Sequence, residues 1–358
     1  MRLLNRYIAK EIYFGTFLVT VALGFLFGLF DFIHELNDIG KGGYQLAQIL
    51  LFVLLSVPGH IYELFPIAVL IGTLYGLGQL TTHSEMTVMR ASGMSRFRLG
   101  GSLIKAGLLF VVLTLLVGEW VMPVAEKSAQ ELRLKALNNF VTSQFRSGIW
   151  AKDSGRFINV QEMLPDGSLK GVRIYQFDTQ HHLVSISMAQ QGHYTGHEQW
   201  RLEDVDRTYF EGNQVRGEHV NEIQWNTPLT PDLMTTLLVQ PEQMSLVNLF
   251  KYVKHLRENS QQSVRFEIAG WSKLIYPLST LVMMQLALPF SLHRPRTGTI
   301  GGRIMMGIVL GLVYYLVNHF FDFEGQLYNW NVVLTTTVPL LTFMLLSLGL
   351  GWWVERRA

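Results

Sequence analysis

An acid, two methionines and an arginine share one short polar stretch, SEMTVMRASG at residues 84–93, between two long apolar segments. A carboxylate makes charge-assisted hydrogen bonds, and methionine offers a soft apolar surface that fits an irregular groove. On a helix, these side chains would form a docking surface for a partner protein. Alternatively, the helix would lie on the membrane and be attracted to anionic lipid by its arginines. The docking residues would be Glu85, Met86, Met89 and Arg90.

The same stretch carries signals that begin and end a helix. Ser84 is a candidate N-cap, Glu85 would meet the positive end of the helix dipole, and Gly93 is a candidate C-terminal cap. The spacing therefore predicts a helix over 84–94. Nowhere does the chain contain a G-x-x-x-x-G-K-[ST] phosphate loop, so we expect no ATP hydrolysis by this chain and no nucleotide cofactor. It also lacks a nucleophile–base motif, so we predict no catalytic residue.

A second group of candidates consists of ionisable side chains within apolar segments, which by default suggest a cavity or a pathway. His60 and Glu63 lie deep in one such segment, and His319 lies near the end of another. For His60 and Glu63 a cavity lining and a helix interface are both open. Glu119 and Asp322 are expected simply to reach the outer headgroups.

One motif, His193-x-x-x-His197-Glu198, has the residue spacing of a metal-binding site. Such ligands must share one face of a helix, but Gly192 and Gly196 predict a hairpin at this point. We therefore expect surface histidines in a turn and no metal site. The absence of cysteine excludes disulfides and thiolate ligands.

The elements that must position these groups follow from composition. Of 358 residues, 49% are hydrophobic and 16% are charged, and the charges concentrate between about residues 126 and 270. Since about 20 apolar residues cross a bilayer as a helix, the chain is predicted to be a membrane protein with one water-exposed insert. Its net charge of +2 gives no reason to expect nucleic acid. The predicted spans are Ile12–Ile33, Leu46–Leu80, Ser102–Met122, Trp271–Leu292, Ile304–Phe321 and Val332–Trp353.

Basic residues near the spans predict the orientation, because cytoplasmic loops are enriched in lysine and arginine. They gather at one set of span ends, whereas the opposite short loops offer Lys41 and several acids. Both termini are thus predicted to be cytoplasmic and the insert to lie on the far side. The basic residues are Arg2, Arg6, Lys10, Arg90, Arg96, Arg98, Lys105, Arg294, Arg296, Arg303, Arg356 and Arg357.

The insert changes from helical to alternating periodicity between about residues 140 and 227. Short alternating runs such as RFINVQEM and HLVSISMA, separated by turn sequences, predict an antiparallel sandwich or roll. An uncovered edge of such a sheet could pair with a partner strand. Residues 245–259 then read as an amphipathic helix that returns the chain to the membrane. Three Gly-x-x-x-Gly pairs, at 24/28, 72/76 and 307/311, indicate close packing of helices.

Several short motifs follow one another along the chain: RYI-x-K at 6–10, LLSVP at 54–58, FP at 65–66, LGQL at 77–80, Glu85 with MRASG at 89–93, GEWVMP at 118–123, GIWAKD at 148–153 and WSKLIYPLSTLVMMQLALPF at 271–290. In this order they closely resemble the LptF/LptG family of permeases, which help extract lipopolysaccharide from the inner membrane of Gram-negative bacteria. The resemblance spans nearly the whole chain, and the runs GEWV and WAKD are most similar to the LptG branch.

This resemblance implies an α-helical membrane protein with six transmembrane helices and a periplasmic all-β jellyroll-like domain. The expected domains are 1–135, 136–245 and 246–358. It implies an LptF-like permease, an LptB-like ATPase dimer that binds ATP and Mg²⁺, and an LptC-like single-span protein as partners. The helix at 84–94 would be the coupling helix, with Glu85 in contact with the ATPase and Met86, Met89 and Arg90 in its groove.

One departure from the family concerns the end of the first span, where the family is expected to present lysines to lipid A phosphates. Here the stretch is DFIHELNDIGKGG, and its acids would repel phosphate. Arg133 and Lys135 are therefore the better candidates, and a divalent cation bridging acid and phosphate is a further hypothesis. The full set of candidate lipid-binding residues is Asp31, Glu35, Lys41, Glu63, Phe65, Arg133, Lys135, Tyr315 and His319.

The predicted function is that of a transmembrane subunit of a lipopolysaccharide extractor, located in the inner membrane and driven by a partner ATPase. Extraction needs external work, since each methylene that leaves hydrocarbon costs about 0.8 kcal/mol. The alternatives are a permease for another amphiphile such as a lipoprotein, and a membrane scaffold that transports nothing.

Overall fold

The computed structural model describes residues 2–137, 148–153, 155–164, 167–178, 180, 182–212, 214–231, 234, 240–259, 261–292 and 300–356. Arg294, Arg296 and Arg357, used above for orientation, lie outside these residues, as does the start of the predicted insert at 138–147. The described part contains six helices long and apolar enough to cross a membrane. The expected fold class, six such helices and a separate β domain, is confirmed.

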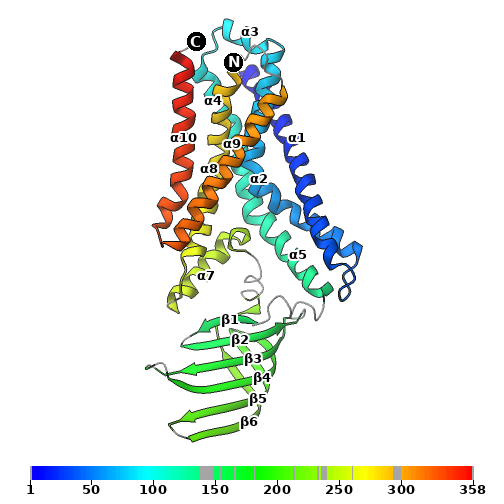
Figure 1. The fold of residues 1–358 in the computed structure, drawn as a ribbon, viewed down its shortest axis with the longest axis vertical. Coiled ribbons are helices and arrows are strands. Elements are labelled where there is room, and N and C mark those ends of the chain that lie inside the picture. Colours follow the sequence, from blue (N-terminus) through cyan, green and yellow to red (C-terminus); the bar gives the residue numbers. More distant parts are fainter. Residues whose placement is uncertain are drawn as a thin grey trace.

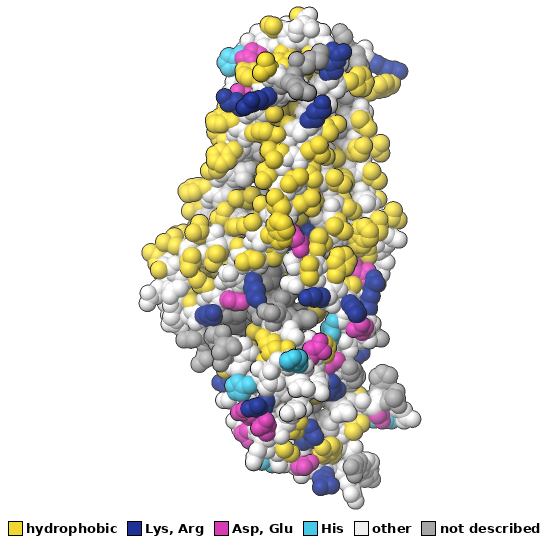
Figure 2. Space-filling view, turned by 180° about the vertical axis from the view of Figure 1, so that it is seen from behind, with side chains coloured by type: hydrophobic (Ala, Val, Ile, Leu, Met, Phe, Trp, Pro, Cys, Tyr) yellow, Lys and Arg dark blue, Asp and Glu magenta, His cyan; other side chains and the backbone are white. Residues whose placement is uncertain are grey.

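The membrane-spanning helices stand side by side, and the β domain lies beyond one end of them (Figure 1). Both termini and the short helix α3 (Glu85–Ala91) lie at the opposite end (Figure 1). A band of hydrophobic side chains covers the helical part, and charged side chains lie beyond both of its edges (Figure 2). The spanning helices are α1 (Arg2–Glu35), α2 (Leu46–Thr82), α4 (Arg96–Leu116), α8 (Val264–Leu292), α9 (Ile300–Leu327) and α10 (Val332–Arg356).

α2 covers the predicted span and continues through Pro58 and Pro66 without interruption, because each proline removes only one hydrogen bond from a long, apolar helix. α4 continues through the π-helical turn η2 (Val117–Val121) into α5 (Met122–Leu137), well beyond the predicted end at Met122. The third span therefore projects past the apolar band towards the β domain.

The Gly-x-x-x-Gly pair at 72/76 brings α2 against α1. A Cβ at Gly72 would lie 2.4 Å from the Cα of Thr16, and one at Gly76 would lie 3.0 Å from the backbone of Glu11. Gly307 and Gly311 of α9 similarly receive Ile71 and Ile67 of α2. These glycines thus pack helices together within the chain, as predicted.

The β domain is one antiparallel sheet in which every strand pairs with the next in sequence. Alternate side chains form a core on one face, and Trp200 at its centre donates a hydrogen bond to the carbonyl of Leu229 at 2.8 Å. The strands are β1 (Ile149–Asp153), β2 (Arg156–Met163), β3 (Leu169–Phe177), β4 (Leu183–Gly196), β5 (Gln199–Glu211) and β6 (Gln214–Asn226).

The predicted hairpin at the pseudo-metal spacing is present. His197 and Glu198 form the turn between β4 and β5 with positive φ angles, and His193 lies in β4. No cluster of metal-binding side chains occurs among the described residues. After the sheet, η4 (Pro241–Gln243) leads into α7 (Leu246–Glu258), which begins and ends close to the predicted bounds.

Candidate functional site

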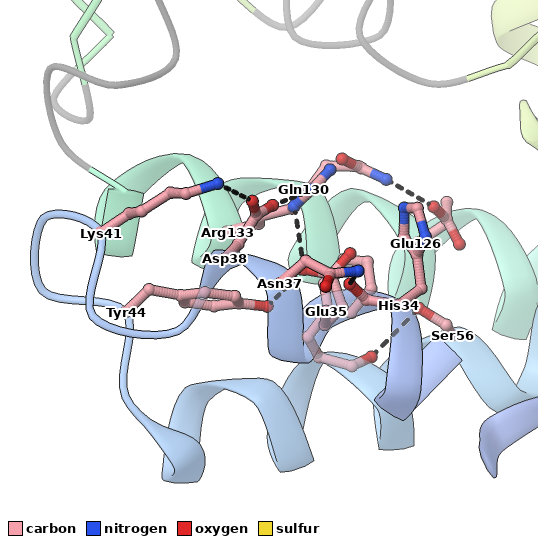
Figure 3. Close-up of polar contacts among 11 residues, drawn as sticks. His34, Glu35, Asn37, Asp38, Lys41, Tyr44, Ser56, Glu126, Gln130 and Arg133 are labelled. Carbon is pink, nitrogen blue, oxygen red and sulfur yellow. Dashed lines mark hydrogen bonds and ion pairs between the residues drawn. The ribbon is translucent and has the colours of Figure 1, made fainter. Parts of the chain in front are cut away.

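The end of α1 nearest the β domain carries a cluster of charges, the α1-end cluster, formed with the following turn and with α5 (Figure 3). Arg133 of α5 pairs through Nε with Glu35 Oε2 at 3.1 Å and through Nη2 with Asp38 Oδ2 at 2.9 Å. Lys41 pairs with the other oxygen of Asp38 at 2.6 Å. Glu35 is only 3% exposed, so its charge depends on these partners.

Tyr44 completes the environment of Glu35. Its hydroxyl donates to Glu35 Oε2 at 2.9 Å, and its side chain is fully buried (Figure 3). Burial and the neighbouring Glu35 carboxylate raise the pKa of the Tyr44 hydroxyl well above its ordinary value. Tyr44 therefore remains a hydrogen-bond donor at every physiological pH.

A second pairing joins α1 to α2. Asp31 Oδ2 lies 2.5 Å from His60 Nε2, and Gln130 of α5 donates to Glu126 at 2.9 Å nearby. The acids that the sequence places at the end of the first span thus have partners on neighbouring helices. They hold α1, α2 and α5 together on the side of the β domain.

This arrangement bears directly on the predicted phosphate contacts. Arg133 and Lys41 both face carboxylates of their own chain, so a phosphate would have to compete with Glu35 and Asp38 for them. Lys135 is exposed and makes no ion pair with any described residue. Of the three predicted cations, Lys135 is therefore the most available to bind an anionic headgroup.

A separate pocket of about 410 Å³ lies between α2, η4, α8 and α9 and gathers three predicted residues, Glu63, Tyr315 and His319. The rings of Tyr315 and His319 are 4.2 Å apart between centroids. This pocket is also lined by Asp322, for which we expected only a position among the outer headgroups. Glu63 thus lines a cavity, which is one of the two settings that the sequence left open for it.

Sequence reasoning missed several residues of this pocket. Lys273 of α8 is buried, donates to the Met244 carbonyl and lies 6.0 Å from the ring centre of Tyr62. Tyr276 donates to the backbone carbonyl of Glu63. A lone lysine in an apolar span was the available signal for Lys273, since such a residue needs buried partners.

Phe65 belongs to neither site. It packs against the core between α1, α2 and α4, with its ring 5.5 Å from that of Phe110. A direct contact with lipid is therefore not suggested by its position.

The predicted helix at 84–94 is present as α3 (Glu85–Ala91). Gly93 ends it with φ +90°, and the amide of Met94 donates to the carbonyl of Met89 at 3.1 Å, as expected of a C-terminal cap. Ser84 precedes the helix in the left-handed region, and its side chain makes no capping hydrogen bond, contrary to the expectation.

The two methionines of α3 point into the chain's own core. Met86 is 4% exposed and Met89 is 7% exposed, and both pack in the cluster that contains Ile8 and Leu77. They attach α3 to the spanning helices instead of lying on its outer surface. Val88, which is 66% exposed, is a large apolar side chain that α3 presents outwards.

Comparison with known proteins agrees with this architecture. Residues 6–353 match the family model described as "Lipopolysaccharide export system permease LptF/LptG". The chain belongs to the LptF/LptG family. It is 35% identical to LptG of Haemophilus influenzae over 99% of this chain and 98% of that protein, and 34% identical to LptG of Escherichia coli K12 over 97% of each. Identity to LptF of Escherichia coli K12 is 21% over 97% of this chain and 94% of that protein.

The predicted family membership is therefore confirmed, and so is its LptG-like character. Relatives of both kinds, LptF and LptG, match across the membrane helices and the β domain alike. The family is one of transport permeases, and the six apolar helices make this member a multi-pass membrane protein.

Proposed function

We propose that this chain is one of two transmembrane subunits of a lipopolysaccharide exporter. It would take lipopolysaccharide from the inner membrane and pass it to a periplasmic bridge of β domains. The observation that carries this proposal is the match to the export permease family over residues 6–353, with six spanning helices and a separate antiparallel sheet in the same chain.

Two observations support the proposed orientation. The termini and α3 share one end of the helical part, and the β domain lies at the other (Figure 1). Basic residues such as Lys10, Arg90 and Lys105 belong to the first end. By the enrichment of basic residues in cytoplasmic loops, that end is cytoplasmic and the β domain is periplasmic.

Energy for export is supplied by a partner, an LptB-like ATPase dimer that binds ATP and Mg²⁺. Glu85 stands at the first turn of α3, and Arg90 is exposed on its last turn. In this proposal, Glu85 makes a charge-assisted contact with the ATPase and Arg90 and Val88 lie against it. Met86 and Met89 transmit the movement of α3 to α1, α2 and α4, since they pack on those helices.

The remaining partners complete the assembly. An LptF-like permease pairs with this chain around an outward-facing cavity, with α1 as part of its lateral gate, and an LptC-like single-span protein joins at the side. The jellyroll-like β domain passes lipid on by continuing its sheet at an open edge. Lys135 is the cation offered to a lipid A phosphate when the substrate enters.

The proposal is tested by substituting Glu85 in the complete complex reconstituted in vesicles. Glu85→Ala and Glu85→Gln should each reduce ATP-driven release of lipopolysaccharide at least about tenfold, because a charge-assisted interface contact is lost. Thr87→Ala, at an exposed position of the same helix, is the matched control and should retain release. A scaffold would keep ATPase activity and release in all three variants, which would refute the coupling role.

A different measurement tests the alternative that this chain is a permease for another amphiphile. Mass spectrometry of the lipid that copurifies with the wild-type complex should identify lipopolysaccharide. A lipoprotein in its place would overturn the substrate while leaving the transport mechanism intact.

A further inference from the structure

A second cavity, of about 240 Å³, opens on the core face of the β domain. Its apolar lining includes Ile174, Leu202 and Val205, which belong to or pack on the sheet core. Beyond them the inward-facing positions become polar. Ser185 and Ser187 of β4 are both buried on this face.

The cavity is rich in hydrogen-bond donors. Arg207 of β5 and Arg156 of β2 both line it, and no Asp or Glu is among its lining residues. Arg156 is neutralised by Asp153, which lies 3.1 Å away. Arg207 makes no ion pair with any described residue, so its charge is the one left for a ligand.

Neutral neighbours hold the Arg207 guanidinium in place. Its Nε donates to Ser187 Oγ at 3.1 Å, and its Nη1 donates to the Tyr209 hydroxyl at 3.0 Å. These two bonds use only part of its five donors. The cross-strand neighbour Glu218 is exposed and does not approach Arg207 within ion-pair distance.

One further donor in the lining is unsatisfied. The indole Nε1 of Trp225 is buried and has no hydrogen-bond partner among the described residues. A buried N–H without a partner destabilises the folded state, so an acceptor in the cavity would relieve this cost. Two kinds of donor, a guanidinium and an indole N–H, thus line one small cavity over an apolar floor.

We propose that this cavity binds the phosphate group of a phosphorylated sugar headgroup, with Arg207 as its main charged contact. A phosphate offers several oxygens to the guanidinium, the indole and the serine hydroxyls at once. The apolar floor would lie under the sugar ring or the start of an acyl chain. Only the identity of the lipid rests on the proposed export function, whereas the class of anion rests on the cavity itself.

The test is equilibrium binding to the purified full-length chain in detergent, with inorganic phosphate and glucosamine 1-phosphate as probes. Saturable binding of one probe molecule per chain is expected, and Arg207→Gln should weaken it at least about tenfold. Trp225→Phe, which keeps the ring but removes the donor, should weaken it about threefold or more. Arg207→Lys should restore part of the loss, because it keeps the charge without the fork.

Arg173→Gln is the matched control. Arg173 lies on β3 within the same sheet but is exposed at an outward-facing position beside the buried Val172. Arg173→Gln removes the same charge as Arg207→Gln. An equal loss of binding in Arg173→Gln would therefore indicate nonspecific electrostatic attraction of the probe and would overturn the site. No binding to wild type, no effect of Arg207→Gln, or equal binding of acetate would each overturn it too.

Failure of this site and failure of the export proposal are distinguishable. Binding of glucosamine 1-phosphate to the purified chain needs neither ATP nor partners. A chain that binds the probe but belongs to a complex that releases no lipopolysaccharide keeps this site and loses the export function. The reverse result keeps export and removes the site.

Discussion

Two arginines, one in α5 and one in the β domain, have opposite surroundings. Arg133 at the α1-end cluster lies between two carboxylates, Glu35 and Asp38, whereas Arg207 in the β domain is held by a serine and a tyrosine. The first is committed to joining helices, because releasing it would leave a buried carboxylate unpaired. The second is held in position and retains its charge for a ligand. A basic residue near a lipid route is thus a binding residue only if its own chain does not already neutralise it.

Breaking the Arg133 pairs should give the largest effect. Arg133→Gln leaves Glu35 buried without its cation and should lower the free energy of unfolding by about 3 kcal/mol. Thermal unfolding of the purified chain in detergent measures this change. Lys135→Gln, one turn or less away on α5 and without an ion pair among the described residues, should leave stability nearly unchanged. Equal stability of the two variants would show that the cluster holds nothing together.

The Tyr44 hydroxyl should have the next largest effect. Tyr44→Phe keeps the buried ring but removes the hydrogen bond to Glu35, which should cost about 2 kcal/mol, as for a bond to a charged acceptor. In an Arg133→Gln background the same substitution should cost a different amount, since both residues serve one carboxylate. Strict additivity in this double-mutant cycle, followed by thermal unfolding, would contradict a shared role.

Removing one of the two carboxylates that pair with Arg133 should make its guanidinium available to bind a phosphate. Asp38→Asn removes a partly exposed carboxylate from both Arg133 and Lys41, at a stability cost of about 1 kcal/mol or less. Photocrosslinking of lipopolysaccharide to a probe at position 135 of the complete complex should rise about threefold. Glu131→Gln removes the same charge elsewhere on α5 and is the control. An unchanged crosslink would mean that Arg133 is not what limits contact with phosphate.

The smallest effect concerns an exposed histidine of the β domain. The carboxylate of Asp206, 2.8 Å from His219 Nδ1, raises the pKa of His219. A raised pKa in the folded chain stabilises it at acidic pH, and this contribution is lost as the pH rises through that pKa. His219→Gln should therefore lower the thermal midpoint slightly at about pH 5.5 and leave it unchanged at about pH 8.5. A larger loss at the higher pH would contradict the pairing.

Much of the architecture was predictable from local sequence. The run RFINVQEM coincides with β2, the amphipathic pattern at 245–259 predicts α7 closely, and Gly93 ends α3 as expected. The predicted third span ends at Met122, whereas the helix itself continues as the more polar α5 to Leu137. Hydropathy finds where a helix leaves hydrocarbon but not where the helix ends.

The candidate sites were less predictable. Glu63, Tyr315 and His319 were candidates from the sequence, and all three line one pocket. Lys273 lines the same pocket but was missed. Met86 and Met89 also show a limit of prediction from the sequence. Their spacing indicates one helix face but cannot tell whether that face meets a partner or the chain's own helices.

From sequence alone came the six apolar spans, the change to alternating strands and the family, because periodicity and motifs are local properties of a chain. Only the tertiary structure decided which charges are free. Arg133 and Asp38 are 95 residues apart in sequence yet form an ion pair, while Arg207 donates hydrogen bonds to the neutral side chains of Ser187 and Tyr209. The reason is physical: the availability of a charge depends on its distance to every other charge, and packing sets those distances.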